Sequence, residues 1–248
     1  RRQRQMCIRD SSRELYKFFD REGNTLVLRP DFTPSVSRAC ATYFNPEKEV
    51  VSLCYTGNTF INNSSFRGRL KETTQMGVER MGDDSPEADA EILAMTVECL
   101  LAAGLTEFQV SVGQVDYYKA IFAQTGLSQE EEEELRELIS QKNYFGVEEL
   151  VKNKNMDKSL ARVLSQLPQM FGSTEVLEKA KSLTDNPQAL KAVARLEEIY
   201  ELLKVYGYEK YVTFDFAMLS KYHYYTGIIF QAYTYGTGEA LILSLIHI

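Results

Sequence analysis

The chain has 248 residues, of which 44% are hydrophobic and 25% charged, and its formal net charge is −7. This composition is typical of a globular chain that can bury a sizeable core, and no apolar run approaches the roughly 20 residues that a transmembrane helix needs. Four cysteines without paired spacing and only two histidines argue against a zinc site, and the acidic balance argues against a nucleic-acid partner, which needs a basic surface.

Both ends are expected to be non-native. Residues 1–13 carry four arginines in their first nine positions and show no usable periodicity, and residues 243–248 finish an apolar tail that has no turn or cap. No signal peptide is recognisable, and the unpaired cysteines favour free thiols in a reducing compartment, so a cytoplasmic location is expected.

The first predicted elements are a short amphipathic segment over Glu14–Asp20, a turn, and a strand over Thr25–Arg29, a pair that fits a hairpin equally well. A helix follows, with Thr33 as its N-cap and Pro34 at its first position. Its apolar face is predicted to comprise Val36, Ala39, Cys40 and Tyr43. Asp31 lies at the strand-to-helix junction, where it either meets a ligand or shapes the turn.

A strand is predicted over 50–56, then an irregular loop whose turn formers include Gly57 and Asn58, then a returning strand over 71–79. Gln75, Gly77 and Glu79 fall two residues apart, so on a strand they share one face. An amide and a carboxylate on one face suit a small polar ligand, and a solvated hairpin is the alternative.

Helical patterns dominate from residue 86 to residue 206. The first helix, predicted over 86–103, follows a cap-and-proline start, and its core positions are predicted to be Ile92, Met95, Cys99 and Ala102. A strand over 107–113 comes next. Residues 115–206 are predicted to form an all-helical block between two strand-rich parts, which indicates an insertion. Ser128 and Glu131 form a capping box there, and Glu130–Glu134 is interpreted as a solvated face instead of a metal site.

The last helix of this block is predicted over 187–206, with Asn186 as cap and Gly207 as stop. Strands are then predicted over 211–216 and 228–235. Tyr222, Tyr224 and Tyr225 lie between them and either wall a pocket or serve as ordinary strand residues. The glycines of 236–238 are a weak signal for a phosphate loop, because no helical pattern follows them.

Four motifs in this order resemble the class II histidyl-tRNA synthetase core: LRPDFTPSVSRA, YTGNTFINNSSFRGRLKETTQMGVE, PEADAEILAM and YHYYTGIIFQAYTYGTG. The chain is more similar to a non-synthetase paralogous family, the regulatory subunits of ATP phosphoribosyltransferase. The resemblance implies an α+β fold, an antiparallel sheet flanked by helices, with the core in residues 14–114 and 207–242 and a helical insertion in 115–206.

The resemblance also implies a histidine-like pocket. The matching positions are Arg29, Asp31 and Thr33 near the family's histidine and ATP sites, Arg69 at the end of the second-motif loop, Gln75 and Glu79 for the histidine amino group, and Tyr224 and Tyr225 beside the imidazole. Neither a metal nor a cofactor is implied.

Two departures separate the chain from the synthetases. Ile61 stands where the synthetase Phe-Arg-x-Glu segment has an arginine that clamps the α-phosphate of ATP, and Ser220 stands where a second arginine is expected. Adenylate formation needs fixed cations on the transferring phosphate, so the resemblance implies a scaffold without adenylation chemistry. The family's Gly-Gly-Arg-Tyr-Asp run and its N-terminal dimer motif are also absent.

Three functions follow as hypotheses. The first is a non-catalytic regulatory subunit that assembles with a short-form ATP phosphoribosyltransferase catalytic subunit, as a dimer or hetero-octamer by resemblance, and carries feedback inhibition by histidine at the first step of histidine biosynthesis. The second is a catalytic histidyl-tRNA synthetase, which predicts histidine-dependent pyrophosphate exchange. The third is a histidine-binding module with another partner.

Overall fold

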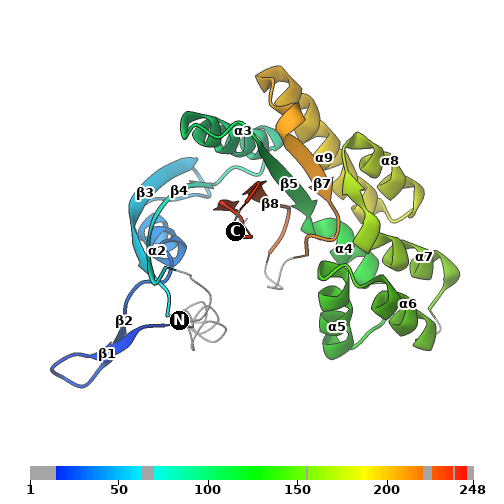
Figure 1. Ribbon diagram of the computed structural model, residues 1–248, viewed down its shortest axis with the longest axis horizontal. Coiled ribbons are helices and arrows are strands. Elements are labelled where there is room, and N and C mark those ends of the chain that lie inside the picture. Colours follow the sequence, from blue (N-terminus) through cyan, green and yellow to red (C-terminus); the bar gives the residue numbers. More distant parts are fainter. Residues whose placement is uncertain (1–14, 63–69, 155, 220–224, 237, 245–248) are drawn as a thin grey trace. The chain divides into compact units, whose positions relative to one another are not determined.

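The computed structural model describes residues 15–62, 70–154, 156–219, 225–236 and 238–244 (Figure 1). Contacts divide the chain into two compact units, with the boundary between Asp83 and Asp84. Helices and strands occur in both units, which agrees with the predicted α+β class. Within the described ranges, no helix combines the length and the apolar character that crossing a membrane requires.

In its described residues, the first unit contains two antiparallel hairpins and one helix. Its elements are β1 (Lys17–Phe19), β2 (Thr25–Val27), α2 (Thr33–Tyr43), β3 (Val51–Phe60) and β4 (Glu72–Met81). β1 pairs with β2, with Phe18 opposite Leu26, so the hairpin alternative for this segment is confirmed. The Asp20 carboxylate accepts the backbone N–H groups of Glu22 and Asn24 at 3.0 and 2.8 Å and thereby forms the turn.

The start of α2 differs from the prediction. Phe32 occupies the N-cap position, and its side chain forms no capping hydrogen bond. Thr33 is the first helical residue. Asp31 accepts the Thr33 N–H at 3.0 Å, which leaves the Thr33 hydroxyl for another partner. Tyr43 is 79% exposed, so it does not belong to the buried face of this helix.

The predicted loop that includes Gly57 and Asn58 is also wrong, because both residues lie in β3 and pair with β4. A Cβ atom at Gly57 would lie 2.6 Å from Phe32 Cζ. Gly57 is therefore a close-packing glycine inside a strand, where sequence alone indicated a turn.

The second unit contains a five-stranded sheet and the remaining helices. Its strands are β5 (Phe108–Gln114), β6 (Phe171–Gly172), β7 (Val212–Asp215), β8 (Ile228–Thr234) and β9 (Ile242–Leu243). Its helices are α3 (Pro86–Ala102), α4 (Val115–Phe122), α5 (Gln129–Ser140), α6 (Tyr144–Asn153), α7 (Lys158–Gln166), η2 (Leu167–Gln169), α8 (Thr174–Ser182), α9 (Pro187–Tyr206) and η3 (Glu209–Tyr211). The strand order is β6-β7-β5-β8-β9; β5 and β7 pair in parallel, and the other neighbours among these described strands pair antiparallel.

The core of this unit lies between one face of the sheet and the long helices. Val110 and Val112 of β5 and Phe214 of β7 are almost completely buried, because alternate strand residues point to the same face. α9 packs against both α3 and α4, and the ring of Tyr200 meets Phe214 edge to face at 5.9 Å.

One ion pair joins α3 to α9 inside this packing. Arg195 Nε and Nη2 donate to Asp89 Oδ2 at 2.9 and 2.7 Å, and Nη1 donates to the Asp84 carbonyl at 3.0 Å. The Asp89 side chain is only 3% exposed. A buried charge of this kind depends on its partner for its solvation.

Several helix ends confirm the capping predictions. Ser128 and Glu131 form both hydrogen bonds of the capping box at the start of α5. Asn186 caps α9, and Gly207 ends it in the left-handed conformation with φ of 76°. In α3, however, the predicted core positions are only partly right. Ile92 is half-buried and packs against the core, but Cys99 and Ala102 are exposed, and the buried apolar residues include Leu93, Val97 and Leu100. Apolar residues lie all around α3, so periodicity alone did not identify its buried side.

The segment 115–206 contains α4 to α9 and also the two-residue strand β6, which pairs with β7 of the sheet. In Figure 1, α5, α6 and α7 lie next to one another within the second unit. The boundaries of an inserted domain stay a prediction.

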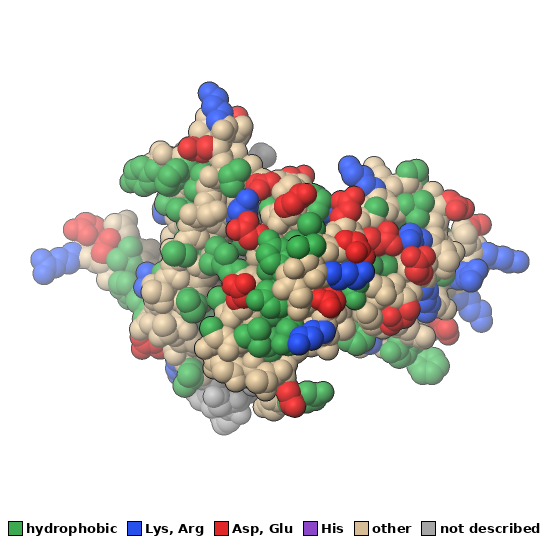
Figure 2. Space-filling view, turned by 90° about the horizontal axis from the view of Figure 1, so that it is seen from above, with side chains coloured by type: hydrophobic (Ala, Val, Ile, Leu, Met, Phe, Trp, Pro, Cys, Tyr) green, Lys and Arg blue, Asp and Glu red, His purple; other side chains and the backbone are tan. Residues whose placement is uncertain are grey.

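On the face shown in Figure 2, basic and acidic side chains are interspersed, and apolar ones lie between them.

Candidate ligand pocket on the β3–β4 hairpin

The β3–β4 hairpin determines where the predicted pocket residues lie. In its register Tyr55 lies opposite Gly77, Gly57 opposite Gln75, and Leu53 opposite Glu79. Gln75, Gly77 and Glu79 are half-buried, while the residues between them are exposed. The prediction that these three residues share one face is therefore confirmed, and Tyr55 lies on the same face.

Glu79 is the centre of a hydrogen-bonded cluster. Thr33 Oγ1 donates to Glu79 Oε1 at 3.0 Å, and the Tyr55 hydroxyl donates to the same oxygen at 3.4 Å. Thr33 is 3% exposed, so its hydroxyl is directed to Glu79 instead of water. Burial raises the pKa of Glu79, the charge of Asp31 adds to this effect, and the Thr33 hydrogen bond partly offsets it. Two carboxylates in one half-buried cluster favour a cationic ligand group such as an ammonium.

An aromatic stack supports this cluster from α2. The rings of Phe32 and Tyr55 stack with centroids 4.8 Å apart, and the guanidinium of Arg29 lies 4.2 Å from the centroid of Phe32. Arg29 Nε also donates to the Asn58 carbonyl at 2.8 Å, which ties the strand-to-helix junction to β3. Arg29 therefore helps to fix Phe32 and β3 beside the Glu79 cluster.

Replacing Gly77 with alanine is expected to destabilise the hairpin by about 1–3 kcal/mol, the usual cost of overpacking. The new Cβ would lie 2.3 Å from both Cζ and the hydroxyl of Tyr55, so the ring must move away from Glu79. Urea unfolding measures the loss. Gly238→Ala is the matched control, since its Cβ would meet no atom within 4 Å. In a Tyr55→Ala background the clash is absent, so Gly77→Ala should cost little there, and an equal loss in both backgrounds would contradict this explanation.

The raised pKa of Glu79 predicts a pH dependence of stability. The folded protein holds this proton at a pH where the unfolded chain, with the ordinary value of 4.5, has lost it. The free energy of unfolding therefore falls as pH rises from 4.5 through the raised pKa. Measured against Glu79→Gln, the wild-type protein is expected to lose relative stability as the pH increases over this range. An unchanged difference between the two proteins would contradict the raised pKa.

The structure brings Asp31, Thr33, Gln75 and Glu79 together in the first unit. Tyr225 belongs to the second unit, where it is 6% exposed. Two further predicted positions, Arg69 and Tyr224, lie outside the described residues.

Sequence reasoning did not single out Tyr55 and Phe32 as pocket residues. The sequence pattern indicates only that Tyr55 lies in an apolar strand. Its contact with Glu79 depends on the hairpin register, which places Tyr55 opposite Gly77. A tyrosine paired across a hairpin with a glycine was the available signal, because the ring needs the space that the missing Cβ leaves.

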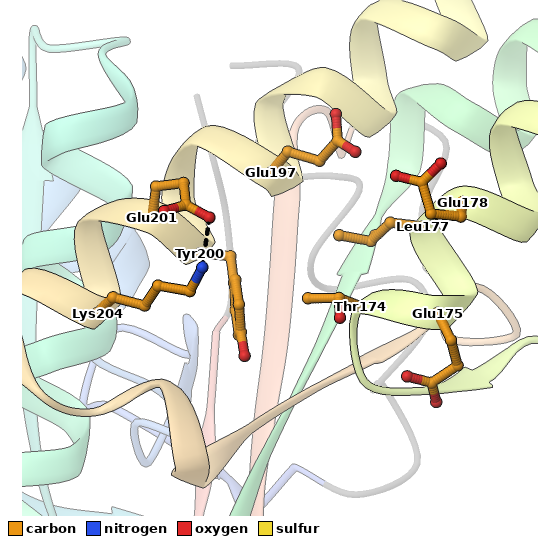
Figure 3. Close-up of a pocket in the computed structure, with 8 residues that line it drawn as sticks. All are labelled: Thr174, Glu175, Leu177, Glu178, Glu197, Tyr200, Glu201 and Lys204. Carbon is orange, nitrogen blue, oxygen red and sulfur yellow. Dashed lines mark hydrogen bonds and ion pairs between the residues drawn. The ribbon is translucent and has the colours of Figure 1, made fainter.

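A surface pocket of about 480 Å³ lies elsewhere, between α8 and α9 (Figure 3). Its lining residues are Thr174, Glu175, Leu177, Glu178, Glu197, Tyr200, Glu201 and Lys204. Lys204 pairs with Glu201 at 2.6 Å and lies over the ring of Tyr200. None of the predicted site residues lines this pocket.

In the part of the chain that the structure describes, no group of three or more histidine, cysteine or carboxylate side chains could hold a metal ion.

The sequence model of one family, described as histidyl-tRNA synthetase, matches residues 3–244. The match covers nearly the whole chain. The chain belongs to the histidyl-tRNA synthetase family.

Within this family, the chain is similar to proteins that are named as regulatory subunits. It is 41% identical over 228 residues to the ATP phosphoribosyltransferase regulatory subunit of Acetivibrio thermocellus, which covers 92% of this chain and 54% of that protein. The chain therefore spans a little over half the length of this curated relative.

Two solved structures show the same fold. A protein from Bacillus halodurans, described as an ATP phosphoribosyltransferase regulatory subunit/histidyl-tRNA synthetase, superposes with a TM-score of 0.81 at 33% identity over 92% of this chain and 59% of that one. A chain of an ATP phosphoribosyl transferase complex from Thermotoga maritima superposes with a TM-score of 0.67 at 20% identity and covers 90% of this chain and 77% of that one. At this identity the likeness is one of fold alone. The predicted class II synthetase-like fold is thus confirmed.

One departure from the histidyl-tRNA synthetases lies in the described part of the chain. Ile61 follows β3 directly, and its N–H donates to the Lys71 carbonyl at 3.0 Å, so the hairpin pairing continues past the strands. The backbone at this position is ordered as a hairpin extension, while the side chain carries no charge for a phosphate. Ser220, the second departure, lies outside the described residues.

Proposed function

We propose that the full-length protein is a regulatory subunit of ATP phosphoribosyltransferase without synthetase activity of its own. The observation that carries the proposal is the 41% identity to a regulatory subunit over 92% of this chain. Ile61, an apolar residue where the synthetases hold an ATP phosphate with arginine, supports it from the chemistry of the site.

The proposed partner is a short-form catalytic subunit, with which the protein forms a hetero-oligomeric glycosyltransferase complex at the first step of histidine biosynthesis. The Thermotoga maritima structure, described as a complex, contains a chain of this fold. A cytoplasmic location belongs to the same proposal, as does the assignment of residues 115–206 to an inserted domain.

We further propose that histidine, the feedback inhibitor, occupies the pocket built on the β3–β4 hairpin. Glu79 and Asp31 supply negative charge for the amino group, and Thr33 holds the Glu79 carboxylate in place. Gln75 shares the strand face of Glu79, and the family resemblance assigns Arg69, Tyr224 and Tyr225 to histidine as well. Inhibition then follows by linkage, because histidine must bind the less active state of the complex more tightly.

A catalytic histidyl-tRNA synthetase is the second candidate. It is favoured by the family match over residues 3–244 and by the double description of the Bacillus halodurans structure. Loss of the phosphate-binding arginine at Ile61 opposes it, since removing one such preorganised group typically costs about 3–4 kcal/mol of transition-state stabilisation.

Reconstitution of the full-length protein tests the proposal. The protein is mixed with a short-form catalytic subunit, ATP and phosphoribosyl pyrophosphate, and phosphoribosyl-ATP formation is followed with and without histidine. Stimulation of the catalytic subunit that histidine suppresses is the expected result. Absence of stimulation, with histidine-dependent ATP–pyrophosphate exchange in a parallel assay, would overturn the proposal in favour of the synthetase. Histidine binding with neither activity would also overturn it and indicate a binding module with another partner.

A further inference from the structure

Tyr55 of β3 contacts the Glu79 cluster, and its ring is held on two sides. The ring stacks on that of Phe32, with centroids 4.8 Å apart and an angle of 20° between the planes. Gly77 lies directly opposite on β4, and a Cβ atom there would lie 2.3 Å from the Tyr55 hydroxyl. The ring therefore has little freedom to turn, and it carries its hydroxyl to Glu79 Oε1 at 3.4 Å.

Glycines on both strands make room for this stack. Gly57 follows Tyr55 by two residues, so the two residues lie on one face of β3. A Cβ atom at Gly57 would lie 2.6 Å from Phe32 Cζ, and Phe32 is 8% exposed. Both rings thus lie against strand backbone at positions where a larger residue would displace them. A hydroxyl at the end of a ring that packing fixes in this way is a preorganised donor.

The two donors of the cluster use the same oxygen of Glu79. Thr33 Oγ1 and the Tyr55 hydroxyl both donate to Oε1, at 3.0 and 3.4 Å. A carboxylate has acceptor sites on both of its oxygens. In the described part of the chain, neither of these donors engages Oε2, so this oxygen can bind a cationic group of a ligand.

Tyr55 remains protonated, and so remains a donor, at neutral pH. Burial raises the pKa of its hydroxyl, and the charges of Glu79 and Asp31 add to this effect. Burial also raises the pKa of Glu79, which the hydrogen bonds from Thr33 and Tyr55 partly offset because they favour the charged form. Among the described residues, Asp31 and Tyr55 are the titratable groups that act on Glu79.

We propose that Tyr55 is a positioning residue, which holds the Glu79 carboxylate by Oε1 and thereby prepares Oε2 to bind the ammonium group of histidine. This inference rests on the proposed function, because it takes histidine as the ligand of the hairpin. Every contact that it uses lies within the first unit. Tyr55 acts through Glu79 and is assigned no contact with the ligand itself.

Calorimetric titration of the full-length protein with histidine tests the inference. Tyr55→Phe keeps the ring over Gly77 and removes the hydroxyl, so histidine affinity at neutral pH is expected to fall about fivefold, the effect of losing one ordinary hydrogen bond. Tyr208→Phe is the matched control. The Tyr208 hydroxyl also donates to a glutamate, Glu98, at 3.1 Å, but it lies in the second unit, so this variant should bind histidine like wild type.

The pH profile of the affinity is a readout that a purely structural role of Tyr55 would not change. Binding of an ammonium group requires ionised Glu79, and Tyr55→Phe lacks a donor that favours this form. The ratio of wild-type to Tyr55→Phe affinity should therefore increase as the pH falls through the raised pKa of Glu79. The titration of free histidine is common to both proteins and cancels in this ratio.

A double variant separates an action through Glu79 from a direct contact with the ligand. In Glu79→Gln the charge that the hydroxyl positions is already absent, so adding Tyr55→Phe should lower the affinity by less than about twofold. Urea unfolding shows whether each variant is folded. If Tyr55→Phe does not fold, Tyr55→Leu, which also lacks the hydroxyl, is measured by the same two criteria.

The outcomes separate the two proposals. A folded Tyr55→Phe protein with wild-type affinity over the whole pH range overturns the inference, while histidine-suppressed activity of the wild-type complex leaves the proposed function standing. The same loss at every pH, or an equal loss in the Glu79→Gln background, would also overturn the inference, because Tyr55 would then act without Glu79. A wild-type protein that neither binds histidine nor stimulates the catalytic subunit overturns both.

Discussion

Replacing Glu79 with glutamine in the full-length protein is expected to weaken histidine binding by about a hundredfold, the upper range for losing a hydrogen bond between charged groups. The substitution keeps an oxygen that can accept the Thr33 hydroxyl, now 3.0 Å from Glu79 Oε1, so the cluster should retain its shape. What is lost is the negative charge that we propose pairs with the amino group of histidine. Calorimetry with histidine measures the loss, and urea unfolding checks that the protein remains folded.

Glu72→Gln provides the matched control on the same strand. Glu72 faces away from the cluster and accepts the Asn58 side-chain N–H at 2.6 Å, so this substitution is expected to leave histidine affinity unchanged. A Glu79→Gln protein that binds histidine like wild type would exclude Glu79 from the pocket. It would move the proposed ligand to another surface of the protein.

The second large effect is expected at the junction of α3 and α9. Arg195→Met should lower the free energy of unfolding by about 3–5 kcal/mol, because it removes from the buried charge of Asp89 the two hydrogen bonds and the opposite charge that Arg195 supplies. The two nitrogens of Arg195 that bond Asp89 lie 2.9 and 2.7 Å from its carboxylate. Urea unfolding at neutral pH measures this change, and the thermal midpoint should fall by roughly 10 °C in a unit of this size.

The double variant Asp89→Ala with Arg195→Met distinguishes an uncompensated charge from lost packing. Removing both charges should recover more than half of the stability that Arg195→Met loses. Lys204→Met is the control for an exposed pair, since Lys204 and Glu201 are accessible and such pairs contribute about 0–1 kcal/mol. A double variant as unstable as Arg195→Met alone would attribute the loss to the packing of the arginine stem.

The features that sequence predicted well depend on neighbouring residues. Asn186 before a proline and Gly207 after the last apolar position predicted both ends of α9, because caps act within a few residues of the helix end. The capping box at Ser128 was predicted for the same reason. The family resemblance supplied the fold, since four short motifs in order are specific even where local patterns are ambiguous.

The features that sequence missed depend on distant residues. Thr33 was expected to cap its own helix, but its hydroxyl bonds Glu79, which lies 46 positions away. Gly57 was assigned to a loop, because turn chemistry and close aromatic packing both favour glycine and only the register with β4 separates them. The same register brings the Tyr55 hydroxyl to Glu79.

The pairing of β5 has a consequence for the order in which the chain can fold. Its two neighbours, β7 and β8, both begin after residue 211. During synthesis β5 therefore leaves the ribosome before either of its partner strands, so both of its edges are unpaired. Synthesis of residues 115–211 then takes about 5–20 seconds. Open strand edges invite aggregation, whereas the helices in between can form from local contacts as they emerge. We expect the helices to form first and the sheet to close last, which makes β5 the segment most in need of protection by a chaperone.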